Sequence, residues 1–93
     1  MSPRVTLRLL SIFVEIIGKK EIEYEADTVK DVIDQFLGEY RERLEDQLLE
    51  ETGYFKDWVI ILLNGTKINF LDGLETKLKS NDVVVIMPLM GGG

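Results

Sequence analysis

The chain has 93 residues, no histidine, no cysteine and a formal net charge of −6 at pH 7. This composition excludes a thiol nucleophile, a catalytic triad built on histidine, iron–sulfur clusters held by thiolates and the ordinary zinc sites. The acidic net charge argues against nucleic-acid binding, which requires a basic surface. The longest apolar run, residues 58–63, is too short to span a bilayer. We therefore expect one soluble, cytoplasmic domain that is not an enzyme on its own, binds no metal or cofactor, and contacts neither nucleic acid nor membrane.

Two short strands are expected before residue 26. Residues 5–9 and 21–25 alternate between apolar and polar side chains, which is the two-residue period of a half-buried strand. The apolar segment 10–17 between them keeps no clean period, and it predicts a loop with a helical turn that ends at Gly18. The two strands should therefore form a hairpin-type pair with a long connection.

A helix is expected to begin at Thr28. Asp31 stands three residues later, where it forms a carboxylate version of the capping box. Gly38 is expected to end or kink this helix. The highly charged residues 41–52 then predict a second, mostly exposed helix, and an acidic docking face is the alternative interpretation of this segment. The first helix carries an apolar face with the 3.6-residue period, made of Val29, Val32, Ile33, Phe36, Leu37 and Tyr40.

The C-terminal half predicts further strands. Residues 58–63 form an apolar strand closed by the hairpin signal Asn64-Gly65, and residues 68–70 continue on a short return strand. After a turn and a short helix in residues 71–78, residues 83–87 form the last strand. Strands 58–63 and 83–87 are apolar at both parities, which is typical of strands covered on both faces. Part of this surface must meet the 10–17 segment, the charged helix or a partner, and the pattern leaves open which parity faces the helix.

This order of elements predicts an α+β domain with a mixed sheet of four to five strands packed on one main helix. The first and last strands should pair in parallel at the centre of the sheet. The domain is expected to cover residues 1–87, and residues 88–93 to form a flexible functional tail. The predicted core contains Val5, Leu7, Leu9, Ile22, Val32, Ile33, Phe36, Ile61 and Val85.

The last six residues carry the candidate chemistry. Glycine has no Cβ, so its backbone can thread a channel too narrow for other residues and adopt φ of either sign. Such a tail offers one reactive group, the terminal carboxyl of Gly93, which we take as the reacting group. An inert, flexible end is the alternative. The residues expected to thread a partner's channel are Pro88, Leu89, Met90, Gly91 and Gly92.

The order of elements, with this ending, resembles the ubiquitin-like β-grasp fold. More narrowly, it resembles the small subunit of molybdopterin synthase and its sulfur-carrier relatives. In that family the stem before the glycines usually has a second proline where this chain has Leu89, and position 91 is more often a small or polar residue. The motifs that carry the resemblance are Gly18-Lys19-Lys20-Glu21, Asp27-Thr28-Val29, Leu63-Asn64-Gly65, Leu74-Glu75-Thr76-Lys77-Leu78, Asn81-Asp82-Val83 and Pro88 through Gly93.

The resemblance implies a definite function. An E1-like activating enzyme would use ATP to adenylate the Gly93 carboxyl, and sulfur transfer would then give a C-terminal thiocarboxylate. Inserted into the large subunit of molybdopterin synthase, this group would donate sulfur to a pterin precursor, for the dithiolene that binds molybdenum or tungsten. Two alternatives stay open. One is a ubiquitin-like protein modifier, or a sulfur carrier for another pathway such as tRNA thiolation; the other is a β-grasp binding module with an inert tail.

Overall fold

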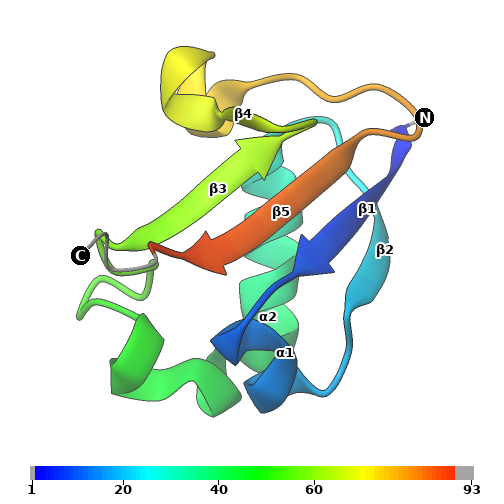
Figure 1. Ribbon diagram of the computed structural model, residues 1–93. Coiled ribbons are helices and arrows are strands. Elements are labelled where there is room, and N and C mark those ends of the chain that lie inside the picture. The colour runs from blue at the N-terminus through cyan, green and yellow to red at the C-terminus, as the bar shows by residue number, and fades with distance from the viewer. Residues whose placement is uncertain (1, 90–93) are drawn as a thin grey trace.

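The computed structural model describes residues 2–89, without the side chains of residues 45 and 46. These residues form a five-stranded mixed sheet with the strand order β2-β1-β5-β3-β4 (Figure 1). The central strands β1 and β5 are parallel, and the other pairs are antiparallel, as the sequence predicts. The strands are β1 (Arg4–Leu9), β2 (Glu21–Glu25), β3 (Val59–Leu63), β4 (Thr66–Lys67) and β5 (Val83–Pro88).

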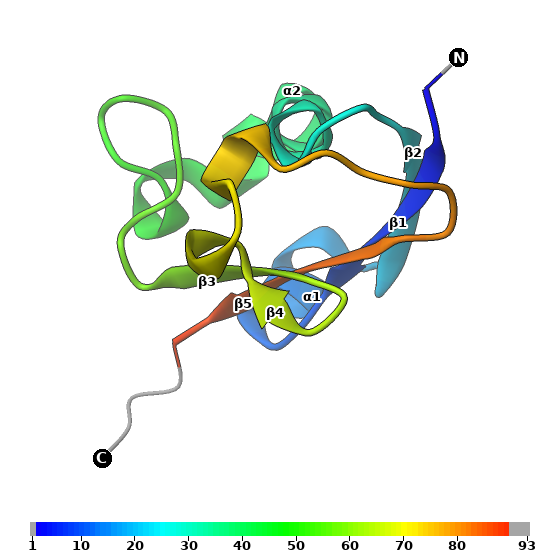
Figure 2. The same cartoon turned by 90° about the horizontal axis from the view of Figure 1, so that it is seen from above.

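One long helix covers one face of the sheet. This helix, α2 (Val29–Leu48), lies behind the sheet in Figure 1, and Figure 2 shows the two layers from above. The predicted capping box is present. The Asp31 N–H donates to Thr28 Oγ1 at 3.2 Å, and the Thr28 N–H donates to Asp31 Oδ2 at 3.2 Å. The reciprocal bonds satisfy donors that the first turn of a helix leaves without a partner.

Gly38 was expected to end or kink the helix, and the first alternative is wrong because the helix does not end there. The prediction of a separate helix from residue 41 is wrong as well. The helix α2 runs through Gly38 to Leu48, and Leu44 and Leu48 on its second half are buried. Gly38 is exposed, and a Cβ there would meet nothing within 4 Å. Glycine in a helix costs about 1 kcal/mol relative to alanine, whereas burying one leucine side chain contributes about 1.5–3 kcal/mol. Tertiary packing therefore outweighs the local preference.

Two connecting segments are more helical than predicted. Residues 12–17 form the short helix α1 (Ile12–Ile17), which ends before Gly18 as expected, with Gly18 at φ 81°. The predicted return strand is shorter than expected, because Ile68 and Phe70 lie in the 3₁₀ helix η1 (Ile68–Phe70) that follows β4. A second 3₁₀ turn, η2 (Gly73–Glu75), lies in the 71–78 segment where a short helix was expected.

The core lies between α2 and the sheet face that it covers. Of the predicted core residues, Ile22 and Ile61 are only half-buried, although both pack against the core. The prediction for Val85 is wrong: its neighbours Val84 and Ile86 are fully buried against the helix, and the alternation of the strand turns Val85 to the opposite face. The predicted core residues that are buried are Val5, Leu7, Leu9, Val32, Ile33 and Phe36.

Candidate functional site

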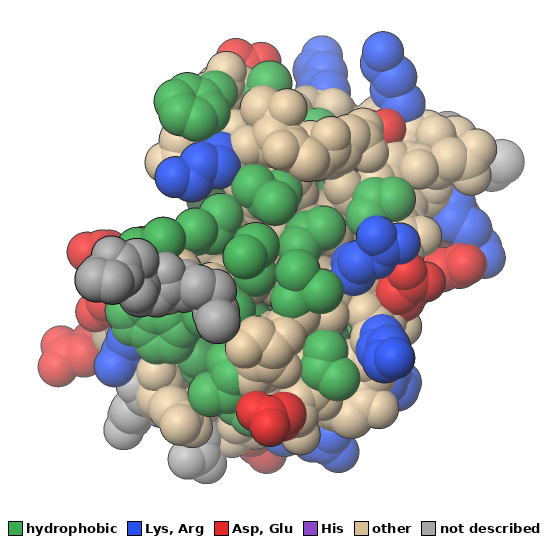
Figure 3. All heavy atoms as spheres, viewed as in Figure 1, with side chains coloured by type: hydrophobic (Ala, Val, Ile, Leu, Met, Phe, Trp, Pro, Cys, Tyr) green, Lys and Arg blue, Asp and Glu red, His purple; other side chains and the backbone are tan. Residues whose placement is uncertain are grey.

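Within residues 2–89, no helix covers the sheet face opposite α2, which we call the open face (Figure 2). Strand alternation places Ile60 and Leu62 of β3 on this face together with Val85 and Met87 of β5. The register agrees, because Ile60 pairs with Met87 and Leu62 with Val85. All four side chains are half-buried, and we call them the apolar patch. Figure 3 shows hydrophobic side chains gathered on this face over β3 and β5.

The other half of the open face carries paired charges. Arg4 Nη1 lies 3.0 Å from Glu23 Oε1, and Arg8 donates from both Nε and Nη2 to Glu21 Oε2, at 3.0 and 2.8 Å. These side chains are exposed, and an exposed ion pair contributes about 0–1 kcal/mol. The ion pairs therefore define the charge pattern of the face more than they stabilise the fold.

The tail leaves the sheet beside the apolar patch. Strand β5 ends at Pro88, one residue after Met87, and the proline ring has no N–H with which to continue a ladder. The Leu89 N–H donates to the Trp58 carbonyl oxygen at 2.6 Å, and the Leu89 side chain is 57% exposed. Of the residues predicted to act in the tail, Pro88 and Leu89 are thus placed next to the patch. The others, Met90, Gly91, Gly92 and Gly93, lie outside the described residues.

One cluster of titratable groups lies away from this face. Lys30 Nζ donates to Asp34 Oδ2 at 2.7 Å, and the Tyr54 hydroxyl donates to Asp34 Oδ1 at 2.8 Å. The hydrogen bond from Lys30, followed by the one from Tyr54, lowers the pKa of Asp34. Burial, followed by the hydrogen bond to Asp34, raises the pKa of Tyr54. The cluster ties α2 to the segment before β3, and we assign it a structural role.

The rest of the described chain carries no metal site and no membrane-spanning helix. Among the side chains of residues 2–44 and 47–89, no group of three or more acidic, histidine or cysteine residues could hold a metal ion. No helix within residues 2–89 is long and apolar enough to cross a membrane. The tail and the open sheet face are accordingly the candidate functional site.

The sequence model of the ThiS family matches residues 7–93, which include the tail. The chain belongs to the ThiS family. Members of this family are ubiquitin-like sulfur carriers and modifiers, so the resemblance that the motif order indicated is confirmed at this level. The ubiquitin-like β-grasp fold is confirmed as well.

Similar proteins and structures agree with this assignment. Small archaeal modifier protein 3 of Haloferax volcanii is 37% identical over 90 residues, which are 94% of this chain and 96% of that protein. The solution structure of small archaeal modifier protein 1 from Methanosarcina acetivorans is 28% identical, with a TM-score of 0.85, and the match covers 100% of this chain and 99% of the other. A chain of the Amycolatopsis orientalis BexX/CysO complex is 26% identical, with a TM-score of 0.75, over 96% of this ThiS-family chain and 99% of its own.

Sequence reasoning located the tail of this ThiS-family protein but not the apolar patch. Both parities of β3 and β5 are apolar, so the pattern within each strand does not distinguish the two faces. The usable signal lies in β1, where polar residues alternate clearly with buried ones. Once β1 is paired with β5, Thr6 lies beside Val83 and Arg8 beside Val85, which assigns Val85 to the open face.

Proposed function

We propose that the chain is a sulfur carrier that acts as the small subunit of molybdopterin synthase. The observation that carries this proposal is that the tail leaves the sheet directly beside an apolar patch in a member of the ThiS family. The patch would seat a partner protein, and the tail would extend from that contact into the partner's active site. The proposed reacting group is the terminal carboxyl of Gly93.

The chemistry needs activation because a carboxylate is a poor acyl donor at neutral pH. In the proposed reaction, an ATP-dependent activating enzyme joins the Gly93 carboxylate to AMP and releases pyrophosphate. Hydrosulfide from a sulfur donor then attacks the acyl carbon, the bond to AMP breaks, and the departure of AMP leaves a thiocarboxylate at the chain terminus. The thiocarboxylate sulfur is soft and easily deprotonated, so it is a good nucleophile for transfer to a pterin precursor in the large subunit. Glycines at positions 91–93 allow this terminus to pass through a narrow channel.

The same patch would be used by two partners in turn. The activating enzyme and the large subunit must both reach the Gly93 carboxyl, and the patch adjoins the point where the tail begins. Partial burial of Ile60, Leu62, Val85 and Met87 leaves each of them with apolar surface that a partner can cover. We therefore propose that binding of one partner excludes the other, which orders activation before sulfur delivery.

A second candidate function is protein modification. It is favoured by the 37% identity to small archaeal modifier protein 3 and by the likeness to small archaeal modifier protein 1. In this reaction the activated Gly93 carboxyl would acylate a lysine amine of another protein and form an isopeptide bond. The two candidates share the activation step and differ in the nucleophile that consumes the activated carboxyl.

An acceptor experiment distinguishes the two candidates. The thiocarboxylated chain is mixed with a molybdopterin synthase large subunit and its pterin precursor, and the dithiolene product is measured. We expect product formation to consume the thiocarboxylate, and a chain lacking Gly93 to give none. In a parallel reaction with the activating enzyme, ATP and a cell extract, Gly93 is searched for on lysine side chains by mass spectrometry. Lysine conjugates without any dithiolene product would favour the second candidate, and the absence of both products would count against both candidates.

A further inference from the structure

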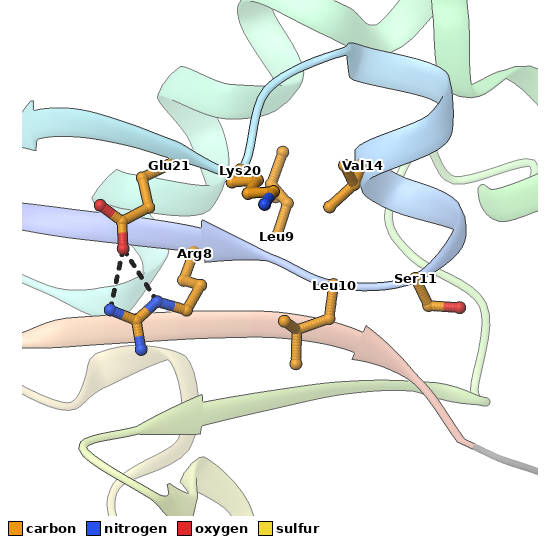
Figure 4. A pocket seen from close by; sticks show the side chains of 7 residues that line it. All are labelled: Arg8, Leu9, Leu10, Ser11, Val14, Lys20 and Glu21. Atoms are coloured by element: carbon orange, nitrogen blue, oxygen red, sulfur yellow. Dashed lines mark hydrogen bonds and ion pairs between the residues drawn. The ribbon is translucent and has the colours of Figure 1, made fainter.

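A recess borders the open face, at the carboxyl end of β1. It has a volume of about 480 Å³ and lies among the end of β1, the beginning of α1 and the beginning of β2. We call it the β1 pocket. Figure 4 shows an ion pair at one end, aliphatic side chains at the other, and Lys20 between them. The proposed tail chemistry uses none of these side chains.

The aliphatic end of the β1 pocket leaves apolar surface uncovered. Leu9 is 1% exposed and forms the floor of the pocket, whereas Leu10 is 38% exposed and Val14 is half-buried. Covering such surface with another apolar group is favourable, because it removes the surface from water. This end of the pocket therefore favours an aliphatic group.

The backbone holds Leu10 in place at a conformational cost. Ser11 has φ 57° and ψ −128°, a strained combination that residues with a side chain rarely adopt. The Leu10 N–H donates to the Ile86 carbonyl oxygen at 3.2 Å, and the Phe13 N–H donates to the Leu10 carbonyl oxygen at 3.2 Å. These two bonds fix Leu10 between β5 and α1, so the aliphatic wall is formed before any partner binds.

The charged end of the β1 pocket has a positive balance. Arg8 and Glu21 are joined by two hydrogen bonds to one carboxylate oxygen, and their charges offset each other. Lys20 adds a further positive charge, and among the described side chains no acid lies within 4.0 Å of its ammonium group. In a chain with a net charge of −6, the pocket is a positive point that favours an anionic group.

The β1 pocket is continuous with the apolar patch. Arg8 is the parallel partner of Val85, which belongs to the patch, and Leu10 is hydrogen-bonded to Ile86 one residue further along β5. A protein seated on the patch therefore extends over the pocket. This continuity favours a segment of the same partner as the occupant.

We propose that the β1 pocket accepts a partner segment in which an aliphatic side chain stands next to a carboxylate. The aliphatic group would lie against Leu10 and Val14. The carboxylate would bind the Lys20 ammonium group and the Nη1 atom of Arg8, since Nε and Nη2 already donate to Glu21. The inference rests on the docking role of the patch in the proposed function. It adds one requirement to that function: although this chain is acidic, its partner must present a carboxylate to the pocket. The pairing of this carboxylate with the pocket would fix the orientation of docking.

The charge requirement is tested with a matched pair of variants. Lys20→Glu reverses the charge in the pocket, and Lys19→Glu makes the same change at the neighbouring exposed residue, which does not line it. Dissociation constants for the activating enzyme and the large subunit are measured by calorimetry. We expect Lys20→Glu to weaken binding of at least one partner about tenfold or more, and Lys19→Glu to change it by less than about threefold.

The aliphatic requirement has its own control. Leu10→Ala shortens the pocket wall, and Leu71→Ala shortens a leucine of similar exposure, 43%, outside the pocket. We expect about fivefold weaker binding for Leu10→Ala and almost no change for Leu71→Ala, with thermal unfolding used to confirm that all variants are folded. The proposal is overturned if Lys20→Glu weakens binding no more than Lys19→Glu does, and Leu10→Ala no more than Leu71→Ala does.

Two further outcomes also decide the question. If charge substitutions in the apolar patch abolish binding but the Lys20 and Leu10 variants bind normally, the pocket proposal fails and the proposed function stands. If the patch substitutions have no effect either, docking through this face fails as a whole. Self-association of the free chain that disappears in Lys20→Glu would assign the pocket to a second copy and would contradict a partner segment.

Discussion

Replacing Leu62 and Met87 together by glutamate is expected to weaken binding to the activating enzyme by about 100-fold or more. Both side chains belong to the apolar patch, and a docked partner would bury the two new carboxylates without a counter-charge. A loss of about 2.8 kcal/mol, which is modest for two unpaired buried charges, corresponds to 100-fold in affinity. The fold should persist, because both residues face away from α2. Calorimetry with the activating enzyme and thermal unfolding of the free variant measure the two parts of this expectation.

A variant with the same added charge serves as the control. Gln47→Glu combined with Ser80→Glu also introduces two carboxylates, at exposed positions outside the patch. We expect this chain to bind within about threefold of the unmodified protein, because long-range charge effects on an exposed surface are screened by salt. Equal binding by the patch variant and this control would mean that the activating enzyme docks elsewhere.

The second large effect is expected in the core. Phe36 is fully buried on α2, and its ring lies 5.4 Å from that of Tyr40 and 6.3 Å from that of Phe55, centroid to centroid. Phe36→Ala should lower the free energy of unfolding by about 3–5 kcal/mol, because it removes the buried ring and leaves a cavity. Urea denaturation followed by circular dichroism measures this change.

An exposed phenylalanine provides the comparison for this prediction. Phe70 is 77% exposed in η1, so Phe70→Ala should change the free energy of unfolding by no more than about 0.5 kcal/mol. A loss for Phe36→Ala as small as that for Phe70→Ala would show that α2 does not form the main core contact of the sheet.

The sequence predicted the fold wherever local pattern and tertiary structure agree. The alternation in β1 identified Val5 and Leu7 as core residues, and both are buried. The same reasoning failed at Val85, because β5 is apolar on both faces and only its pairing with β1 determines which side chains meet α2. Strand parity in such a segment depends on register, which involves residues far apart in the sequence.

The length of α2 shows a second limit of local reasoning. A glycine in a helical pattern is a sound signal for a helix end, and its cost is local. The free energy that offsets the cost of Gly38 is not local, because it comes from the packing of Leu44 and Leu48 into a core formed by other elements. A sequence pattern that includes only three leucines in residues 41–52 does not show that two of them become completely buried.

The part of the candidate site that consists of consecutive residues was predictable from the sequence. The tail residues 88–93 form one continuous motif, and their order after an apolar strand indicated the family. The β1 pocket, in contrast, combines Arg8, Leu10 and Val14 with Lys20 and Glu21, which a turn with an unusual conformation at Ser11 brings together. In the sequence alone, Lys20 is one of several lysines with the character of ordinary surface residues.

The roles of the terminal glycines define graded expectations for sulfur loading. A bulky residue in place of Gly92 should prevent it, because a Cβ would collide with a narrow channel and restrict φ. Gly92→Ala should be impaired to a smaller extent. A substitution of Gly91 should be tolerated best, because Gly91 is the farthest of the three glycines from the reacting carboxyl of Gly93. The intact masses of the three variants after identical incubations provide the comparison.

The most direct test is the intact mass of the chain after incubation with ATP, the cognate activating enzyme and a sulfur donor. We expect a mass increase that corresponds to the replacement of one oxygen by sulfur, located by fragmentation at the carboxyl of Gly93. A chain without Gly93, or with a residue added after it, should remain unmodified while unfolding at nearly the same temperature. Normal sulfur transfer from a chain that ends at Met90 would contradict the proposal that the Gly93 carboxyl is the reacting group.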